Sequence, residues 1–157
     1  MIYIFDCSPL IVLFKHFYPD RFPTLWEKFE LLINDQIIIS VREVYNEINT
    51  YGNVDRLVEW AKDNQSFFPL PAIEELEFVT EIFKVNHFQN LIRKKERLQG
   101  KPVADPFVIA KAKINKGCVV TQEEWRENSA KIPNVCEHFG IPCMNLEEFM
   151  QKENWTF

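Results

Sequence analysis

Short apolar runs alternate with segments of helical periodicity along the chain. The apolar runs are rich in β-branched and aromatic residues, and they predict buried strands at residues 2–6, 36–40 and 118–121, with a fourth after the turn at Gly140. Between them, apolar residues spaced three or four apart predict helices from Ser8, over 24–32, 41–48, 54–64, 73–83, 87–98, 105–117 and 133–139, and from Leu146, where Asn145 can cap the start. This alternation predicts an α/β fold with a central parallel sheet of four or five strands and helices on both faces.

Length and composition favour one compact domain spanning residues 1–157. Of the 157 residues, 46% are hydrophobic, which is enough for a substantial core and argues against disorder. The start of the chain lacks the basic segment of a signal peptide, and no apolar run approaches the ~20 residues of a membrane helix. The four cysteines show no CxxC spacing. We therefore expect a cytoplasmic protein without a zinc site.

The charge balance is acidic. A net charge of −5 disfavours a protein that binds nucleic acid mainly by non-specific attraction, although acidic metal ligands contribute to such a deficit. The basic residues of 93–97, together with Lys101, offer a local contact for phosphates or a solvated helix face. Trp125 is the tryptophan that stands beside an acidic candidate residue, and it is either a core or lid aromatic or a base-stacking one.

Four acidic residues stand where an α/β fold would bring them together. Asp6 ends the first strand, Glu47 lies in the helix after the second, Asp105 opens the helix before the third, and Glu123 follows that third strand. Ligands of open parallel sheets bind outside the carboxyl ends of the strands, so these side chains are expected to share one rim. Glu43 lies four residues before Glu47 on the same helix face, so it is an alternative to Glu47 as the acid contributed by the helix after the second strand.

Carboxylates gathered in this way are suited to a divalent cation. Two of them ~5 Å apart repel by roughly 3 kcal/mol at an effective dielectric of about 20, so they need a cation or raised pKa values. Oxygen ligands suit Mg²⁺ or Mn²⁺, and a bound cation supports hydrolysis at phosphorus without a covalent nucleophile. Ser8 and Thr121 are supporting candidates, because a hydroxyl beside Asp6 or Glu123 can orient a ligand or a carboxylate.

Each of these residues also has a structural interpretation. Asp6 could cap the helix that follows it, and Asp105 before Pro106 is typical of an N-cap with proline at the first helical position. Ser8 could likewise be an N-cap, and Thr121 a buried strand residue. The two glutamates could simply be solvated. The joint placement of all the acids at one edge favours the functional interpretation.

With these residues identified, the chain resembles PIN-domain proteins, in particular a little-characterised bacterial branch related to toxin–antitoxin ribonucleases. The resemblance follows the family's order over most of the chain. It rests on Tyr3-Ile4-Phe5-Asp6-Cys7-Ser8, on Ile39-Ser40 followed by Val44-Tyr45-Asn46-Glu47-Ile48, on Ala104-Asp105-Pro106-Phe107-Val108-Ile109-Ala110-Lys111-Ala112, and on Val119-Val120-Thr121-Gln122-Glu123; Lys131-Ile132-Pro133-Asn134-Val135-Cys136 and Gly140-Ile141-Pro142-Cys143 point to the bacterial branch.

The resemblance implies a Rossmann-like domain that binds Mg²⁺ or Mn²⁺ and cleaves RNA, often as the toxin of a toxin–antitoxin pair. It implies Asp6, Glu47 and Asp105 as metal ligands and catalytic residues, with Glu123 as the fourth acid. It also implies an RNA substrate, an antitoxin partner and a homodimer. Two departures stand out: Cys7 where many members have Thr, and Glu123 where Asp or Asn is usual.

Two other classes of protein gather acids at strand ends. A catalytically silent PIN-like or receiver-like domain would be a regulatory or interaction module, and a receiver normally shows an acid pair and a late lysine. A small phosphohydrolase that forms a phospho-aspartate would show Asp-x-Asp, whereas this chain has Asp6-Cys7-Ser8. Because all four acidic positions are filled, we favour the metal-dependent ribonuclease that the resemblance implies over these alternatives.

Overall fold

Four short parallel strands form the central sheet. The protein is represented by a computed structural model, which describes residues 1–52, 54–92, 100 and 103–157. The strands are β1 (Tyr3–Phe5), β2 (Ile38–Ile39), β3 (Cys118–Val120) and β4 (Cys143–Met144), in the order β2-β1-β3-β4. All the pairings are parallel. The predicted α/β class and the parallel sheet, with four strands in the described residues, are confirmed, and the architecture is consistent with a Rossmann-like fold.

The strand order places a topological switch between β1 and β3. From β1 the chain goes on to β2 on one side, whereas β3 and then β4 lie on the other. Tyr3 pairs with Ile38 of β2 and with Cys118 of β3, so the carboxyl ends of the three strands lie at one edge. In open parallel sheets this is where ligands bind.

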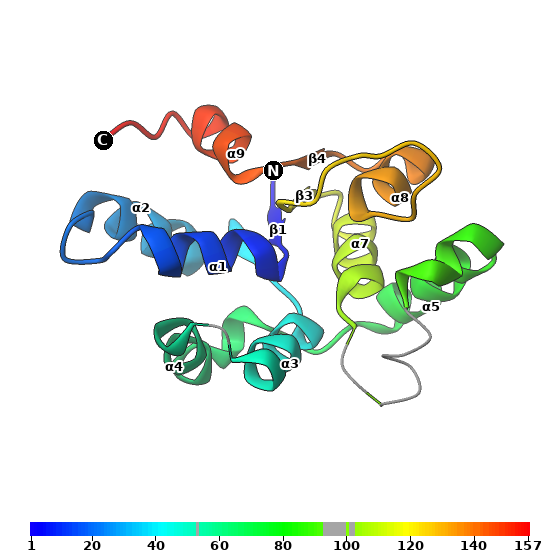
Figure 1. The fold of residues 1–157 in the computed structure, drawn as a ribbon, viewed down its shortest axis with the longest axis horizontal. Helices are drawn as coiled ribbons and strands as arrows, with labels where there is room; N and C mark the ends of the chain where they lie inside the picture. Colours follow the sequence, from blue (N-terminus) through cyan, green and yellow to red (C-terminus); the bar gives the residue numbers. More distant parts are fainter. Residues whose placement is uncertain (53, 93–99, 101–102) are drawn as a thin grey trace.

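Helices surround the sheet (Figure 1). The α-helices are α1 (Cys7–His16), α2 (Pro23–Asn34), α3 (Arg42–Tyr51), α4 (Asp55–Asp63), α5 (Ile73–Phe83), α7 (Asp105–Ile114), α8 (Ile132–Phe139) and α9 (Leu146–Lys152), and two short 3₁₀ helices are η1 (Gln65–Phe67) and η2 (Asn86–Leu91). Helix α7 packs on β1 and β3, and α2 on β2. None of these described helices is long and apolar enough to cross a membrane.

The core fixes the sheet against the last helix. All three residues of β1 are buried, and Phe149 of α9 meets Tyr3 and Phe5 edge to face at centroid distances of 4.8 and 5.2 Å. Such pairs stabilise beyond the area they bury. The predicted cap is confirmed, because the Asn145 side chain accepts from the Glu148 amide and the Glu148 carboxylate accepts from the Asn145 amide, both at 2.8 Å. These ring contacts pack α9 against β1, the strand that leads to Asp6.

One predicted helix is corrected by the structure. Where residues 87–98 were expected to be α-helical, the described part is the 3₁₀ helix η2, and 93–99 lie outside the described residues, as do the basic residues 93–97 and Lys101. Asn86, His87 and Asn90 are weak helix formers. The buried residues of η2, Phe88 and Leu91, are three apart, which matches the 3₁₀ repeat.

Candidate active site

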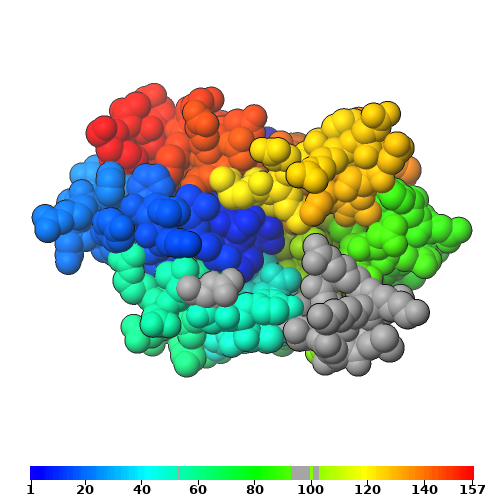
Figure 2. Space-filling model, in the orientation of Figure 1, coloured from blue at the N-terminus to red at the C-terminus, as the bar shows by residue number. Residues whose placement is uncertain are grey.

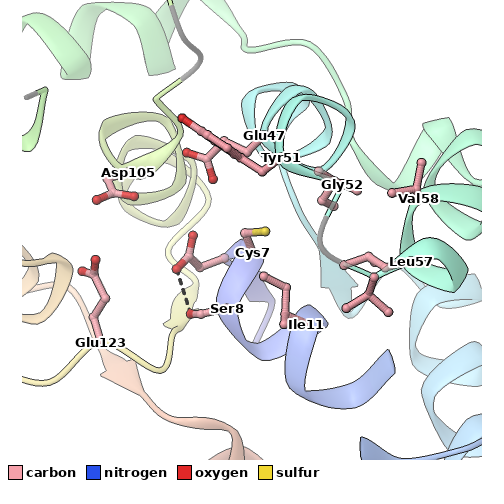
Figure 3. Close-up of a pocket in the computed structure, with 13 residues that line it drawn as sticks. Cys7, Ser8, Ile11, Glu47, Tyr51, Gly52, Leu57, Val58, Asp105 and Glu123 are labelled. Carbon is pink, nitrogen blue, oxygen red and sulfur yellow. Dashed lines mark hydrogen bonds between the residues drawn. The ribbon is translucent and has the colours of Figure 1, made fainter. Parts of the chain in front are cut away.

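Four carboxylates line one cavity at the carboxyl edge of the sheet. Asp6 directly follows β1, Glu47 lies on α3, Asp105 is the first residue of α7 and Glu123 follows β3. All of them line a cavity of about 270 Å³. Figure 3 shows Glu47, Asp105 and Glu123 reaching into the same space from different elements. In Figure 2 the segments that carry the acids, from the blue N-terminus to the yellow segment after β3, meet on one face. The predicted gathering of acids is thus a feature of the structure.

Asp6 is the most deeply buried of the four, with 5% of its surface exposed. Its Oδ2 accepts hydrogen bonds from the hydroxyls of Ser8 and Thr121, each at 3.0 Å (Figure 3 shows the first). Asp6 is the N-cap residue of α1, as the structural interpretation predicted, although its side chain forms no N-cap hydrogen bond to the helix. Ser8 lies inside α1 and is not its cap.

The two hydroxyls also tie Asp6 to the loop that carries Glu123. Ser8 Oγ accepts from the amide of Gln122 at 3.0 Å, and Thr121 Oγ1 accepts from the amide of Glu123 at 3.2 Å. Burial raises the pKa of Asp6, while the facing amide of Cys7 and the hydroxyls of Thr121 and Ser8 act in the opposite direction. Hydrogen bonds to the charged form oppose the effect of desolvation. Ser8 and Thr121 are therefore positioning residues for both acids.

The two glutamates each hold the start of a helix. The amide of Ala104, just before α7, donates to Glu47 Oε1 at 2.9 Å, and the amide of Ile132, the first residue of α8, donates to Glu123 Oε2 at 2.8 Å. Neither glutamate is merely solvated, contrary to the structural interpretation of the sequence. A carboxylate at a helix N-terminus satisfies an amide that has no partner within the helix.

The charges of all three other acids affect the pKa of Asp105. Its pKa lies well above the ordinary value, first because of desolvation at its half-buried position and then because of the charges of Asp6, Glu123 and Glu47. Lys131 acts in the opposite direction. The expected N-cap is off by one residue, since Ala104 is the N-cap and Asp105 begins α7. The four acids therefore form one electrostatic unit that a bound cation would relieve.

Glu43 belongs to a different cluster. It is not among the described residues that line the cavity. Its pKa is raised by burial and by the charge of Glu75, which pairs with Lys111 at 3.2 Å. Glu43 and Glu47 lie on the same face of α3, about one turn apart. A rise of about 1.5 Å per residue separates them by about 6 Å along the helix axis, so they meet different neighbours. Glu47 is therefore the better candidate for the second position.

Sequence reasoning missed the rest of the cavity wall. Cys7 lines it, and burial together with the charges of Asp6, Glu47 and Asp105 raises the pKa of its thiol, which is therefore protonated. Apolar and aromatic side chains of α1, α3 and α4, with Val54 just before α4, complete the wall, namely Ile11, Ile48, Tyr51, Val54, Leu57 and Val58. Each looks like an ordinary core residue in the sequence, and only the packing of α1, α3 and α4 shows that they border the acids.

The donor set consists of oxygen atoms, but the described residues hold no ready-made group of three His, Cys, Asp or Glu side chains that would bind a metal ion. Mg²⁺ does not require such a group. It keeps several of its waters in protein sites and is often bound by one or two carboxylates together with substrate phosphates. Carboxylates that face one cavity and repel one another fit a hydrated divalent cation of this kind.

Comparison with known proteins adds a family. Residues 3–157 match the model of a family described as a domain of unknown function, DUF4411. The chain belongs to this family. No curated protein matches the chain, and no solved structure does. Membership covers nearly the whole chain and so includes all four acids, but the family description carries no activity with it.

Proposed function

We propose that this DUF4411 protein is a Mg²⁺- or Mn²⁺-dependent endoribonuclease. The observation that carries the proposal is the convergence of Asp6, Glu47, Asp105 and Glu123 on one cavity at the topological switch of a parallel sheet. Perturbed acids in a cleft are candidates for function. The resemblance of their motifs to those of PIN-domain proteins supports RNA as the substrate and an antitoxin as a partner.

The cavity residues would take different roles in phosphodiester hydrolysis. A bound cation would polarise a phosphoryl oxygen, lower the pKa of a water molecule and stabilise the leaving oxygen. Asp6 and Asp105 would hold it, because they have the raised pKa values that a cation would lower. Glu47 and Glu123 fix the helix starts around the cavity. The protonated thiol of Cys7 is a poor nucleophile, which favours attack by water.

The same geometry disfavours a receiver-like or phospho-aspartate module. A carboxylate that accepts a phosphoryl group must be reached by its donor. Asp6 is 5% exposed, and its Oδ2 is already engaged by two hydroxyls. A catalytically silent PIN-like module remains the second candidate, because the helix-holding roles of Glu47 and Glu123 serve stability as well as catalysis.

The experiment is cleavage of a mixed pool of labelled RNAs by the purified protein with Mn²⁺, Mg²⁺ or a chelator. Asp6→Asn and Asp105→Asn are compared with Asp20→Asn, an exposed site distant in sequence from the four acids. We expect metal-dependent cleavage that falls roughly 100-fold or more in the first two variants, because a metal supplies several kcal/mol of transition-state stabilisation. Cleavage that persists in chelator, or in both variants, would refute the proposal.

A thermal shift separates the two candidate functions. Mn²⁺ at a hundredfold excess over its dissociation constant should stabilise the parent by about 2.7 kcal/mol, and Asp6→Asn should lose most of this gain. Stabilisation by Mn²⁺ without cleavage of any RNA would favour the silent module. Neither stabilisation nor cleavage would leave the four acids without a shared metal function.

A further inference from the structure

The acid cavity is the first of three hollows that adjoin in series. It shares Asp105 and Glu123 with a second hollow of about 250 Å³, which also contains Lys131. The second shares Ser129 with a third hollow of about 530 Å³. The loop 121–131, yellow in Figure 2, runs beside all three on the face that also shows the N-terminal segment. A chain molecule bound at the acids would thus find further space along this loop.

The third hollow combines aromatic surfaces with hydrogen-bonding groups. Trp125 contributes the largest aromatic surface and is 53% exposed. Phe88 of η2 and His138 of α8 meet edge to face, with ring centroids 5.1 Å apart. The remaining walls carry amide, hydroxyl, imidazole and carboxylate groups, from His87, Asn128, Ser129, Asn134 and Glu137. A flat aromatic molecule with polar edges, such as a nucleobase, matches this lining.

The part of the loop that carries Trp125 is anchored at both sides. The side chain of Asn134 on α8 donates to the carbonyl of Arg126 at 2.6 Å and accepts from its amide at 3.3 Å. On the other side, Glu123 is tied to the start of α8. Two residues span at most ~7 Å between Cα atoms, so Trp125 stays close to the acids. A platform held in place in this way loses little conformational entropy when a ligand stacks on it.

The second hollow supplies a cation between the acids and the platform. Lys131 lines it together with Asp105 and Glu123, and its charge is felt at Asp105. An ammonium group next to carboxylates suits the phosphate of a nucleotide that lies between the two ends. The acids, the ammonium group of Lys131 and Trp125 therefore line adjoining hollows, which suits a ligand that combines phosphates with an aromatic base.

We propose that the third hollow binds an unpaired nucleobase of single-stranded RNA, stacked on Trp125, next to the phosphate held at the acids. The inference rests on the proposed ribonuclease function and adds a substrate subsite to it. Stacking on Trp125 accepts every base, because each has a flat face, so this subsite selects unpaired strands over duplexes. Lys131 contacts the intervening backbone.

Tryptophan fluorescence tests the subsite without cleavage. Trp26 and Trp155 are buried and Trp60 is half-buried, so Trp125 is the tryptophan most open to a ligand. The Asp6→Asn protein is titrated with a mixed-sequence single-stranded oligoribonucleotide, with the matching duplex, and with an abasic ribose-phosphate oligomer of equal length. We expect quenching by the single strand, much less by the duplex, and none by the abasic oligomer.

The matched variants are Trp125→Ala, Trp125→Phe and Tyr18→Ala, the last at a site that is also 53% exposed. Because two of these variants lack the Trp125 reporter, their affinity is measured by the fluorescence anisotropy of a dye-labelled single strand. Loss of stacking should weaken binding of the single strand by roughly 5- to 140-fold in Trp125→Ala. The Phe variant should restore most of the affinity, and Tyr18→Ala should match the parent. A thermal melt near that of the parent establishes that Trp125→Ala is folded.

Three results would overturn the subsite. The first is an affinity of Trp125→Ala for the single strand equal to that of the protein that keeps Trp125. The second is a loss of affinity for the abasic oligomer as large as that for the single strand, and the third is no binding of single-stranded RNA by the protein that keeps Trp125. Failure of the ribonuclease proposal is distinguishable. If the protein cleaves no RNA but binds the single strand in a Trp125-dependent way, the subsite stands and the catalytic function falls.

Discussion

Removal of one charge from the acid cavity should stabilise the metal-free protein. Asp105 is the group to change, because burial and three neighbouring carboxylates raise its pKa. Asp105→Asn keeps the size of the side chain and removes the charge. The variant should therefore be more stable than the parent at neutral pH, although it is expected to be inactive.

The sign and size of the effect follow from proton linkage. Below the ordinary carboxyl pKa of 3.8, Asp105 is protonated in both the folded and the unfolded protein and carries no penalty. As the pH rises towards the raised pKa of the folded state, the unfolded chain loses its proton first and the parent is destabilised. The slope is at most about 1.4 kcal/mol per pH unit for one group. For a chain of this size this is about 3–5 °C per pH unit.

The assay is thermal unfolding in chelator from pH 4 to pH 8 for the parent, Asp105→Asn and Asp20→Asn. The advantage of Asp105→Asn over the parent should grow with pH and then level off, whereas exposed Asp20→Asn should follow the parent throughout. Saturating Mn²⁺ should shrink or reverse the advantage. Melting curves of the parent and Asp105→Asn that coincide at every pH would refute the electrostatic coupling of the acids.

Three further predictions concern the free energy of unfolding. Thr121→Val removes a buried hydroxyl that donates to Asp6, so it should lower the free energy of unfolding by about 1.5–3 kcal/mol in urea titrations, with Thr121→Ser retaining most of it. Gly117→Ala would place a Cβ 2.7 Å from the carbonyl oxygen of Ile2 and should cost about 1–3 kcal/mol in the same assay. Glu75→Gln leaves the largely buried Lys111 without its anionic partner and should cost about 3–5 kcal/mol in the same assay, whereas Glu81→Gln, in the exposed pair with Lys84, should cost under about 1 kcal/mol.

Strand and helix periodicity predicted most of the fold because the signals are local. The run before Asp6 is short and rich in β-branched and aromatic residues, which favours a buried strand. Asn145 is followed three residues later by Glu148, a capping pattern that the structure contains. The α/β alternation then fixed which edge the acids share. Their gathering at one cavity follows from chain order and the parallel sheet alone.

What the sequence could not supply depends on contacts between distant elements. Glu43 and Glu47 are both acids on one face of the same predicted helix. They differ because α5 brings the charge of Glu75 near Glu43, while the amide of Ala104 donates to Glu47. The 3₁₀ helix η2 was predicted to be α-helical, because a spacing of three between apolar residues occurs in both 3₁₀ and α-helices. The apolar wall of the cavity is defined by packing alone.

The helix-holding bonds of Glu47 and Glu123 have a consequence for the family as a whole. Each carboxylate anchors a helix start through a backbone amide, so stability selects for it whether or not the cavity is catalytic. Asp105 is held by no such bond among the described residues, and its desolvation beside three carboxylates is unfavourable. On the proposed function, a relative that has abandoned catalysis should keep both glutamates and lose this aspartate first. Across DUF4411 sequences, the residue at position 105 should therefore be the better marker of metal-dependent activity.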